Sequence, residues 1–221
     1  MKQTYENNKR RIQAFKLTAD VKDNNGMIHH FIDGYEYVEI GGIKWATCNV
    51  GAENETDSGL YFAWGETKGY KDANEKHFTW EDYKFRRHAN FPKYSRNDGL
   101  DTLEACDDAA TQNMGSNWRM PTEDEYRYLL SATTNVWVIN YKSSGINGRL
   151  FIDKTDKSKK LFFPAVGLCY NGSVYYVGTY GNYWSSSLDI LNVAGLCFGS
   201  VDCYVNHYCR NYGFPVRGVI K

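Results

Sequence analysis

Hydrophobic and polar residues alternate in short stretches over much of the chain, which predicts strands rather than long helices. Tyr35–Ile40 alternates as a strand does, Gly41-Gly42 fits a turn, and Ile43–Cys48 fits the returning strand of a hairpin. Further short strands are predicted at residues 60–65, 136–141, 149–153 and 160–163. The last 50 residues are expected to form short strands joined by loops.

Two segments have helical character. Thr122 and Glu125 have the spacing of a capping box, and acidic residues fill the turn between them. An apolar face follows and extends this predicted helix to about Ala132, and Leu103–Met114 also has helical composition. Residues 66–100 are predicted to form a long ordered loop with one helical turn. Two helices among many short strands and long loops place the chain in the α+β class.

The polar residues 1–34 are predicted to be an N-terminal arm or extension, and residues 35–221 the domain proper. The first 16 residues contain no apolar core of a signal peptide, so we expect synthesis in the cytoplasm. In that compartment the six Cys are expected to be free thiols. No Cys-x-x-Cys pair occurs, and neither a metal nor a cofactor is expected.

The charge balance argues against two classes of partner. The chain has 26 basic and 26 acidic side chains, with no long block of one sign. Nucleic acids and anionic membranes attract basic surfaces, so neither is expected as a partner. No stretch reaches the roughly 18 apolar residues of a membrane helix, so membrane insertion is not expected.

The strongest compositional signal lies between Leu161 and Ile220. Lys, Glu, Gln, Met and Trp number 38 in the first 160 residues but occur once in these 60, as Trp184. The segment instead holds four of the six Cys and eight of the 18 Tyr. Burial explains part of this depletion, because Lys and Glu are rarely buried. It does not explain the run 202–212, which has no clean apolar period and is interpreted as a binding surface.

Several short strings follow one another in a fixed order. They are KWATCNVG at 44–51, YFAWGET at 61–67, DDAA at 107–110, WRMPT at 118–122, YWSSS at 183–187 and GFPVR at 213–217. In this order the chain resembles the Fibrobacter succinogenes major paralogous domain of gut Bacteroidales and their phages, over roughly residues 35–220. The resemblance implies a C-type-lectin-like fold.

Some members of that family are variable proteins of diversity-generating retroelements, in which reverse transcription mutates template adenines, usually in Asn codons. Such codons cannot be changed to Lys, Glu, Gln, Met or Trp, the five types depleted after Leu161. The resemblance therefore implies a non-enzymatic receptor or adhesin with a hypervariable C-terminal surface. Its partner would be an unknown protein or cell-surface ligand. Residues 1–34 would attach it to a phage particle or another surface assembly.

The family pattern separates a fixed frame from variable positions. The frame comprises Leu196, Phe198, Ser200, Arg210, Gly213, Val216 and Arg217. The ligand-binding variable positions are Gly195, Cys197, Gly199, Asp202, Cys203, Tyr204, Asn206, His207, Tyr208, Cys209, Asn211 and Tyr212. Strand alternation would direct Leu196 and Phe198 inward, and Cys197 and Gly199 outward. An upstream cluster is assigned to the same face, giving a variable region of about 169–212: Cys169, Tyr170, Asn171, Tyr175 and Tyr176.

Two other functions remain open. Cys203 and Cys209 resemble the late Cys pair of formylglycine-generating oxidases, although five residues intervene here and four do in those enzymes. An undiversified domain of the same fold would be a structural or adhesive module. Calcium-dependent sugar binding is not expected, since Asp189 and Asp202 are the only carboxylates between residues 161 and 220. Trp184 is expected in the core, with Ser185–Ser187 bonded to backbone groups, and Asp107-Asp108 is expected to fix a helix or loop.

Overall fold

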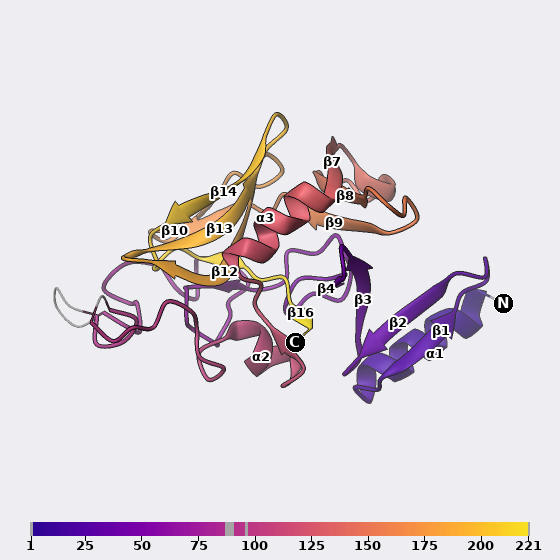
Figure 1. Cartoon of the computed structure of the whole chain (residues 1–221), viewed down its shortest axis with the longest axis horizontal. Coiled ribbons are helices and arrows are strands. Elements are labelled where there is room, and N and C mark those ends of the chain that lie inside the picture. The colour runs from indigo at the N-terminus through magenta and orange to yellow at the C-terminus, as the bar shows by residue number, and fades with distance from the viewer. Residues whose placement is uncertain (1, 87–90, 96, 221) are drawn as a thin grey trace.

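The described part of the chain, residues 2–86, 91–95 and 97–220 of a computed structural model, consists mainly of small antiparallel sheets with three α-helices. This agrees with the predicted α+β class. Figure 1 shows two ends: the N-terminal helix with its two neighbouring strands lies at one, and strands from the last quarter of the chain lie at the other.

A six-stranded sheet joins the beginning of the chain to its end. Its order is β1-β2-β3-β4-β16-β6, so the C-terminal strand lies between β4 and β6. The strands are β1 (Ala19–Lys22), β2 (Ile28–Ile32), β3 (Tyr35–Ile40), β4 (Ile43–Ala46), β6 (Trp118–Arg119) and β16 (Val219–Ile220). The predicted hairpin at residues 35–48 is confirmed as β3 and β4, with Ile40 opposite Ile43.

Residues 1–34 contain a helix that the sequence interpretation did not assign, α1 (Lys2–Ala14), followed by β1 and β2. Ile12 of α1 is buried, and β2 pairs with β3 of the main sheet. Gly34 has φ +84°, and a Cβ there would lie 3.0 Å from Lys16 Cα and 3.1 Å from the backbone oxygens of Ile12 and Gln13. A glycine therefore permits the close approach of the end of α1 to the sheet.

The predicted capping box begins α3 (Glu123–Ala132). The Glu125 N–H donates to Thr122 Oγ1 at 3.2 Å, and the Thr122 N–H donates to Glu125 Oε2 at 2.8 Å. The sheet β7-β8-β9 follows the helix directly: β7 (Thr133–Val138), η1 (Tyr141–Ser143), β8 (Gly148–Asp153) and β9 (Lys160–Pro164). The prediction for β7 was three residues too late, because the strand begins immediately after α3 ends.

Two other predicted elements are shorter than expected. Helix α2 (Ala109–Met114) begins only after Asp108, whose carboxylate accepts from the N–H groups of Thr111 and Met120, both at 2.8 Å. This confirms that Asp107-Asp108 fixes a helix. The strand expected at 60–65 contracts to β5 (Tyr61–Phe62), which pairs with β15 (Phe214–Pro215).

The last quarter of the chain forms a three-stranded sheet and an adjacent hairpin. The sheet is β12 (Gly181–Asp189), β13 (Asn192–Phe198) and β14 (Cys203–Tyr208), with β13 in the centre. The hairpin is β10 (Leu168–Tyr170) and β11 (Ser173–Tyr175). Bridges Gly167–Gly181 and Cys169–Gly213 connect the hairpin to the sheet and to the loop after β14.

Two hydrophobic clusters support these sheets. One contains Trp64, Trp118, Trp184 and Phe214, and the other contains Trp45, Tyr126, Phe163 and Leu196. Trp184 is confirmed as core: its indole N–H donates to Phe62 O at 2.8 Å. The neighbouring serines also contact backbone groups as predicted, for example Ser185 Oγ donating to Ala194 O at 2.6 Å.

Candidate functional site

One face of the β12-β13-β14 sheet is fixed by the core. Leu196 and Phe198 on β13 are fully buried, and Phe198 lies parallel to the Tyr183 ring at a centroid distance of 6.0 Å. The predicted inward direction of these two residues is therefore confirmed. Arg210, Gly213, Val216 and Arg217 of the frame are also buried, whereas Ser200 is exposed in the β13–β14 turn.

The opposite face of β13 is not free surface, which corrects part of the prediction. Gly195, Cys197 and Gly199 lie on the other face of the strand from Leu196 and Phe198, as predicted, but they are buried. A Cβ at Gly199 would lie 3.0 Å from the Tyr180 ring, and a Cβ at Gly195 would lie 2.8 Å from Tyr183 O. The Tyr180 ring thus covers Gly199, and the Tyr208 ring lies 3.6 Å from a Cβ at Gly195.

Asn211 and Cys203 also differ from the prediction. Asn211 is fully buried, and its side-chain amide donates to Phe78 O at 2.9 Å. Cys203 packs with Val205 against the hydrophobic cluster of Leu196 and Phe198. Alternation along β14 places Cys203 and Val205 on the inner face and Tyr204 on the outer face. Asn211 and Cys203, both predicted to bind ligand, therefore contact the scaffold instead.

The remaining predicted positions reach the surface to different degrees. Asp202 and Tyr204 are exposed. The others are partly buried: Asn206, His207, Tyr208, Cys209 and Tyr212. His207 is on the inner face of β14, and its Nε2 lies 3.5 Å from Oε2 of Glu123 on α3. The centroid of the Tyr208 ring lies 4.9 Å from that of Phe214 and 6.3 Å from that of Trp184. The partly buried Tyr208 side chain therefore packs against core residues.

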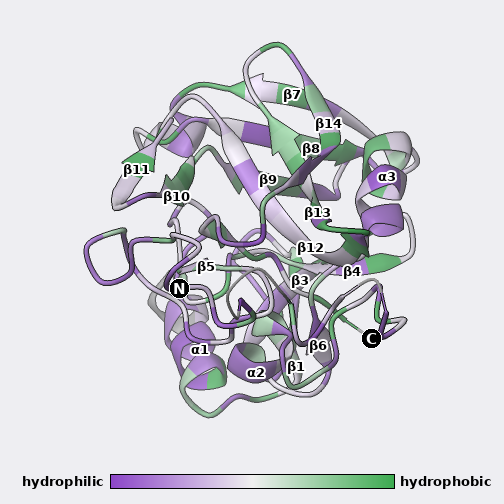
Figure 2. Cartoon of the chain, turned by 90° about the vertical axis from the view of Figure 1, so that its left-hand side faces the viewer, coloured by the Kyte–Doolittle hydropathy of each residue, from purple (hydrophilic) through white to green (hydrophobic). Residues whose placement is uncertain are grey.

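The exposed tyrosines of the last quarter gather on one surface, which we name the tyrosine face. Its members are Tyr170, Tyr175, Tyr176, Tyr180, Tyr204 and Tyr212. The first five are between 40% and 59% exposed. The Tyr170 and Tyr212 rings lie 4.7 Å apart, which joins the upstream cluster to the downstream one. Figure 2 views the molecule from the end that carries β10, β11 and β14.

Contacts connect the rest of the tyrosine face. The Tyr176 ring lies 6.1 Å from Tyr175 and 5.7 Å from Tyr180. Tyr180 covers Gly199, and the hydroxyls of Tyr204 and Tyr208 interact with the thiol of Cys197. Burial raises the pKa of the Cys197 thiol, which keeps it neutral. The tyrosine face therefore consists of ring contacts on β11 and the 176–180 turn, the Tyr170–Tyr212 contact between β10 and the loop after β14, and Tyr204 on β14, with β10 and β11 joined as one hairpin.

The tyrosine face contains no Lys or Arg from its own segment. Arg210 and Arg217 are the only such residues between positions 161 and 220, and both are fully buried. Tyr offers a large apolar ring and a polar hydroxyl with only two rotatable bonds, which suits a contact surface. This arrangement can bind a ligand through ring contacts and neutral hydrogen bonds.

Scaffold side chains hold the backbone under this face without using its side chains. Arg149 on β8 donates from Nη1 to Gly199 O at 2.9 Å and to Asp202 O at 3.3 Å. Asn147 Nδ2 donates to Gly178 O at 3.0 Å. Carbonyl groups are present whatever the side chain, so residues at these turns can change while the turn is kept.

Sequence reasoning missed Tyr180 and Arg149. Tyr180 falls between the two predicted clusters, and its i,i+4 spacing from Tyr176 is the one sequence feature that could have included it. Its N–H donates to Tyr176 O at 3.0 Å. Arg149 lies in β8, far from the variable segment, and nothing in its sequence surroundings indicates its role at the β13–β14 turn.

The structure gives no support to paired chemistry at Cys203 and Cys209. Six residues of extended β14 separate the two Cα atoms by about 20 Å, whereas a disulfide requires roughly 4.4–6.8 Å. Burial raises the pKa of the Cys203 thiol to about 12, so the thiolate is not available near neutral pH.

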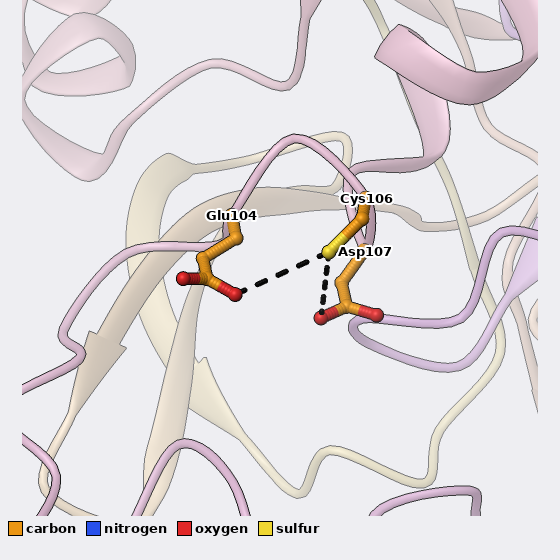
Figure 3. Close-up of side chains that lie close together, drawn as sticks. All are labelled: Glu104, Cys106 and Asp107. Carbon is orange, nitrogen blue, oxygen red and sulfur yellow. Dashed lines mark hydrogen bonds between the residues drawn. The ribbon is translucent and has the colours of Figure 1, made fainter.

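Among the described residues, one group has metal-ligand spacing: Glu104, Cys106 and Asp107. Figure 3 shows the three side chains converging. Lys93 Nζ pairs with both carboxylates, at 2.5 Å from Glu104, and Lys84 Nζ lies 2.8 Å from Asp107. Burial opposes ionisation of Asp107, but hydrogen bonds from Lys84, Lys93 and Tyr94 outweigh it and lower the pKa. Two ammonium groups thus already neutralise this cluster.

Comparisons with family models, curated proteins and solved structures found no match. No helix in the described ranges has both the length and the apolar character needed to cross a membrane.

Proposed function

We propose that this protein is a ligand-binding receptor or adhesin whose tyrosine face is the contact surface. The observation that carries the proposal is the distribution of residue types in the last quarter. Five exposed Tyr lie on one surface, and the segment's two Arg are buried in the scaffold. Tyr-rich surfaces of this kind bind proteins and glycans through rigid aromatic anchors.

We further propose that this surface is diversified and that the fold is C-type-lectin-like. Support comes from the absence of Lys, Glu, Gln and Met from residues 161–220 and from the family strings in the sequence. A scaffold that holds turns through carbonyl groups, as Arg149 does, tolerates side-chain variation. The buried predicted positions, such as Gly195 and Asn211, would then be fixed, and diversity would concentrate at exposed Tyr positions.

The test is the DNA sequence around the gene. We expect a reverse-transcriptase gene and a near copy of the 3′ coding segment that differs from it only at template adenines. We expect those differences at the codons of the five exposed tyrosines, 170, 175, 176, 180 and 204, and not at codons 195 or 211. A neighbourhood with neither feature would contradict diversification and leave an undiversified adhesive module as the function.

A further inference from the structure

A cleft lies along one side of α1. Figure 1 shows α1 at the end of the molecule opposite β10 and β14, which carry part of the tyrosine face. The cleft consists of two adjoining cavities of about 580 and 370 Å³, which share Lys9, Glu36 and Cys48 as lining residues. From Tyr5 to Ala14 the helix rises about 14 Å, which is the length of about four residues of extended chain. The cleft therefore has the dimensions of a short extended peptide segment.

The helix side of the cleft presents cations. Arg10 and Lys16 line the larger cavity, and both are exposed. Within the described ranges neither side chain takes part in an ion pair, whereas Lys9 pairs with Glu36 at 3.8 Å. Because neither cation is paired within the described ranges, both can bind a carboxylate of a ligand.

The sheet side differs in both charge and size. Asp33, Glu36 and Glu53 line it, so a polyanion such as RNA would meet repulsion on this wall. The lining also contains small side chains, Ala14, Ala46 and Ala52, beside which apolar ligand groups can fit; we call this part of the lining the floor.

We propose that this cleft is a second binding site, which takes an extended peptide segment of a partner protein with a carboxylate side chain next to apolar residues. The carboxylate binds Arg10 and Lys16, and the apolar residues fill the floor beside Ala52. The mixed charge of the walls selects a peptide over a nucleic acid, and the concave shape selects it over a flat anionic membrane. The site is independent of the ligand bound at the tyrosine face.

The test begins with a random dodecamer library, displayed on filamentous phage and selected on the full chain. Enriched peptides are synthesised, and their Kd is measured by fluorescence anisotropy on purified variants. We expect Asp or Glu beside apolar residues in the enriched peptides. The Kd should rise about tenfold or more in the Arg10→Ala/Lys16→Ala variant and in Ala52→Trp, which fills the floor.

Two matched controls locate the effect. Arg11→Ala removes an equal charge from the same helix outside the lining of the cleft, and Tyr204→Ala alters the tyrosine face. Both should leave the Kd within about twofold of the wild-type value. Circular dichroism shows whether each variant is folded. If Ala52→Trp does not fold, the Arg10→Ala/Lys16→Ala variant still tests the site, because both side chains are exposed and their removal is not expected to affect folding.

Three results would overturn the proposal. The first is a selection that enriches no peptide sensitive to the cleft variants. The second is a set of peptides weakened by Tyr204→Ala instead, which would place peptide binding on the tyrosine face. The third is tighter binding to phosphatidylserine vesicles or to an oligonucleotide than to any selected peptide. None of these results bears on the DNA test of diversification.

Discussion

The two faces of the β12-β13-β14 sheet share one backbone but differ in what covers them. Leu196 and Phe198 on the inner face are fully buried, whereas Tyr180 and Tyr204 on the outer side are 45% and 43% exposed. A change at Leu196 or Phe198 removes buried apolar contacts and leaves a cavity, while a change at Tyr180 or Tyr204 removes contacts that are only partly buried. Variation at low cost in stability is therefore expected at the exposed tyrosines, and not at every outer position, because Trp184 and Val193 on the outer face are also fully buried.

Two buried arginines also belong to the scaffold. Arg217 and Arg149 donate to backbone carbonyls, and their partners do not depend on the side chains of the tyrosine face. Both arginines therefore stabilise the fold together with the buried residues of the two hydrophobic clusters. The exposed side chains of the tyrosine face can then be selected for binding.

The severest test of this division is Arg217→Met. Arg217 is fully buried and donates to Asn49 Oδ1 at 2.9 Å, Ala46 O at 3.0 Å and Phe162 O at 3.1 Å. Its loss leaves these acceptors unpaired, so urea denaturation should show the free energy of unfolding lowered by about 3–5 kcal/mol. Arg127→Met, at an exposed pair with Glu123, should change it by less than about 0.5 kcal/mol. Equal losses in both variants would remove the distinction.

A second test compares the two faces directly. Leu196→Ala should lower the free energy of unfolding by about 3 kcal/mol, because it opens a cavity in a fully buried cluster. Tyr204→Ala, one strand away on the outer face, should lower it by less than about 0.5 kcal/mol. Urea denaturation of both variants measures the difference, and a loss at Tyr204 as large as that at Leu196 would show that the tyrosine face is structural.

The smallest expected effect concerns the start of α3, which packs on β12, β13 and β14. Burial opposes ionisation of Glu125, but hydrogen bonds from Arg119 and the Thr122 N–H outweigh it and lower the pKa. The wild type should therefore be more stable than Glu125→Gln by about 1 kcal/mol above roughly pH 4.3, the ordinary Glu value. That advantage is lost as the pH falls through the lowered pKa of the folded state.

Urea denaturation of wild type and Glu125→Gln between about pH 2.5 and pH 7 measures this difference. Glu123→Gln is the matched control, since Glu123 lies in the same turn and is not part of the capping box. A difference that does not change with pH would contradict an ionised Glu125 as the cause.

Local signals in the sequence were sufficient for several elements. The capping box of Thr122 and Glu125, the hairpin at residues 35–46 and the inward direction of Leu196 and Phe198 all depend on neighbouring residues, and the structure confirms them. The polar helix α1 was missed because only Ile12 is buried on it among the residues whose side chains are described, so its pattern resembles that of a solvated arm.

The sequence alone determined the α+β class, the depleted composition of the last quarter and which residues of β13 share a face. Only the tertiary structure decided that Gly195, Cys197 and Gly199 are covered and that Tyr170 meets Tyr212. The physical reason is that a period of two shows which side chains lie on one side of a strand. What covers that side depends on residues distant in the chain, such as Tyr180 over Gly199 and Arg149 beneath the β13–β14 turn.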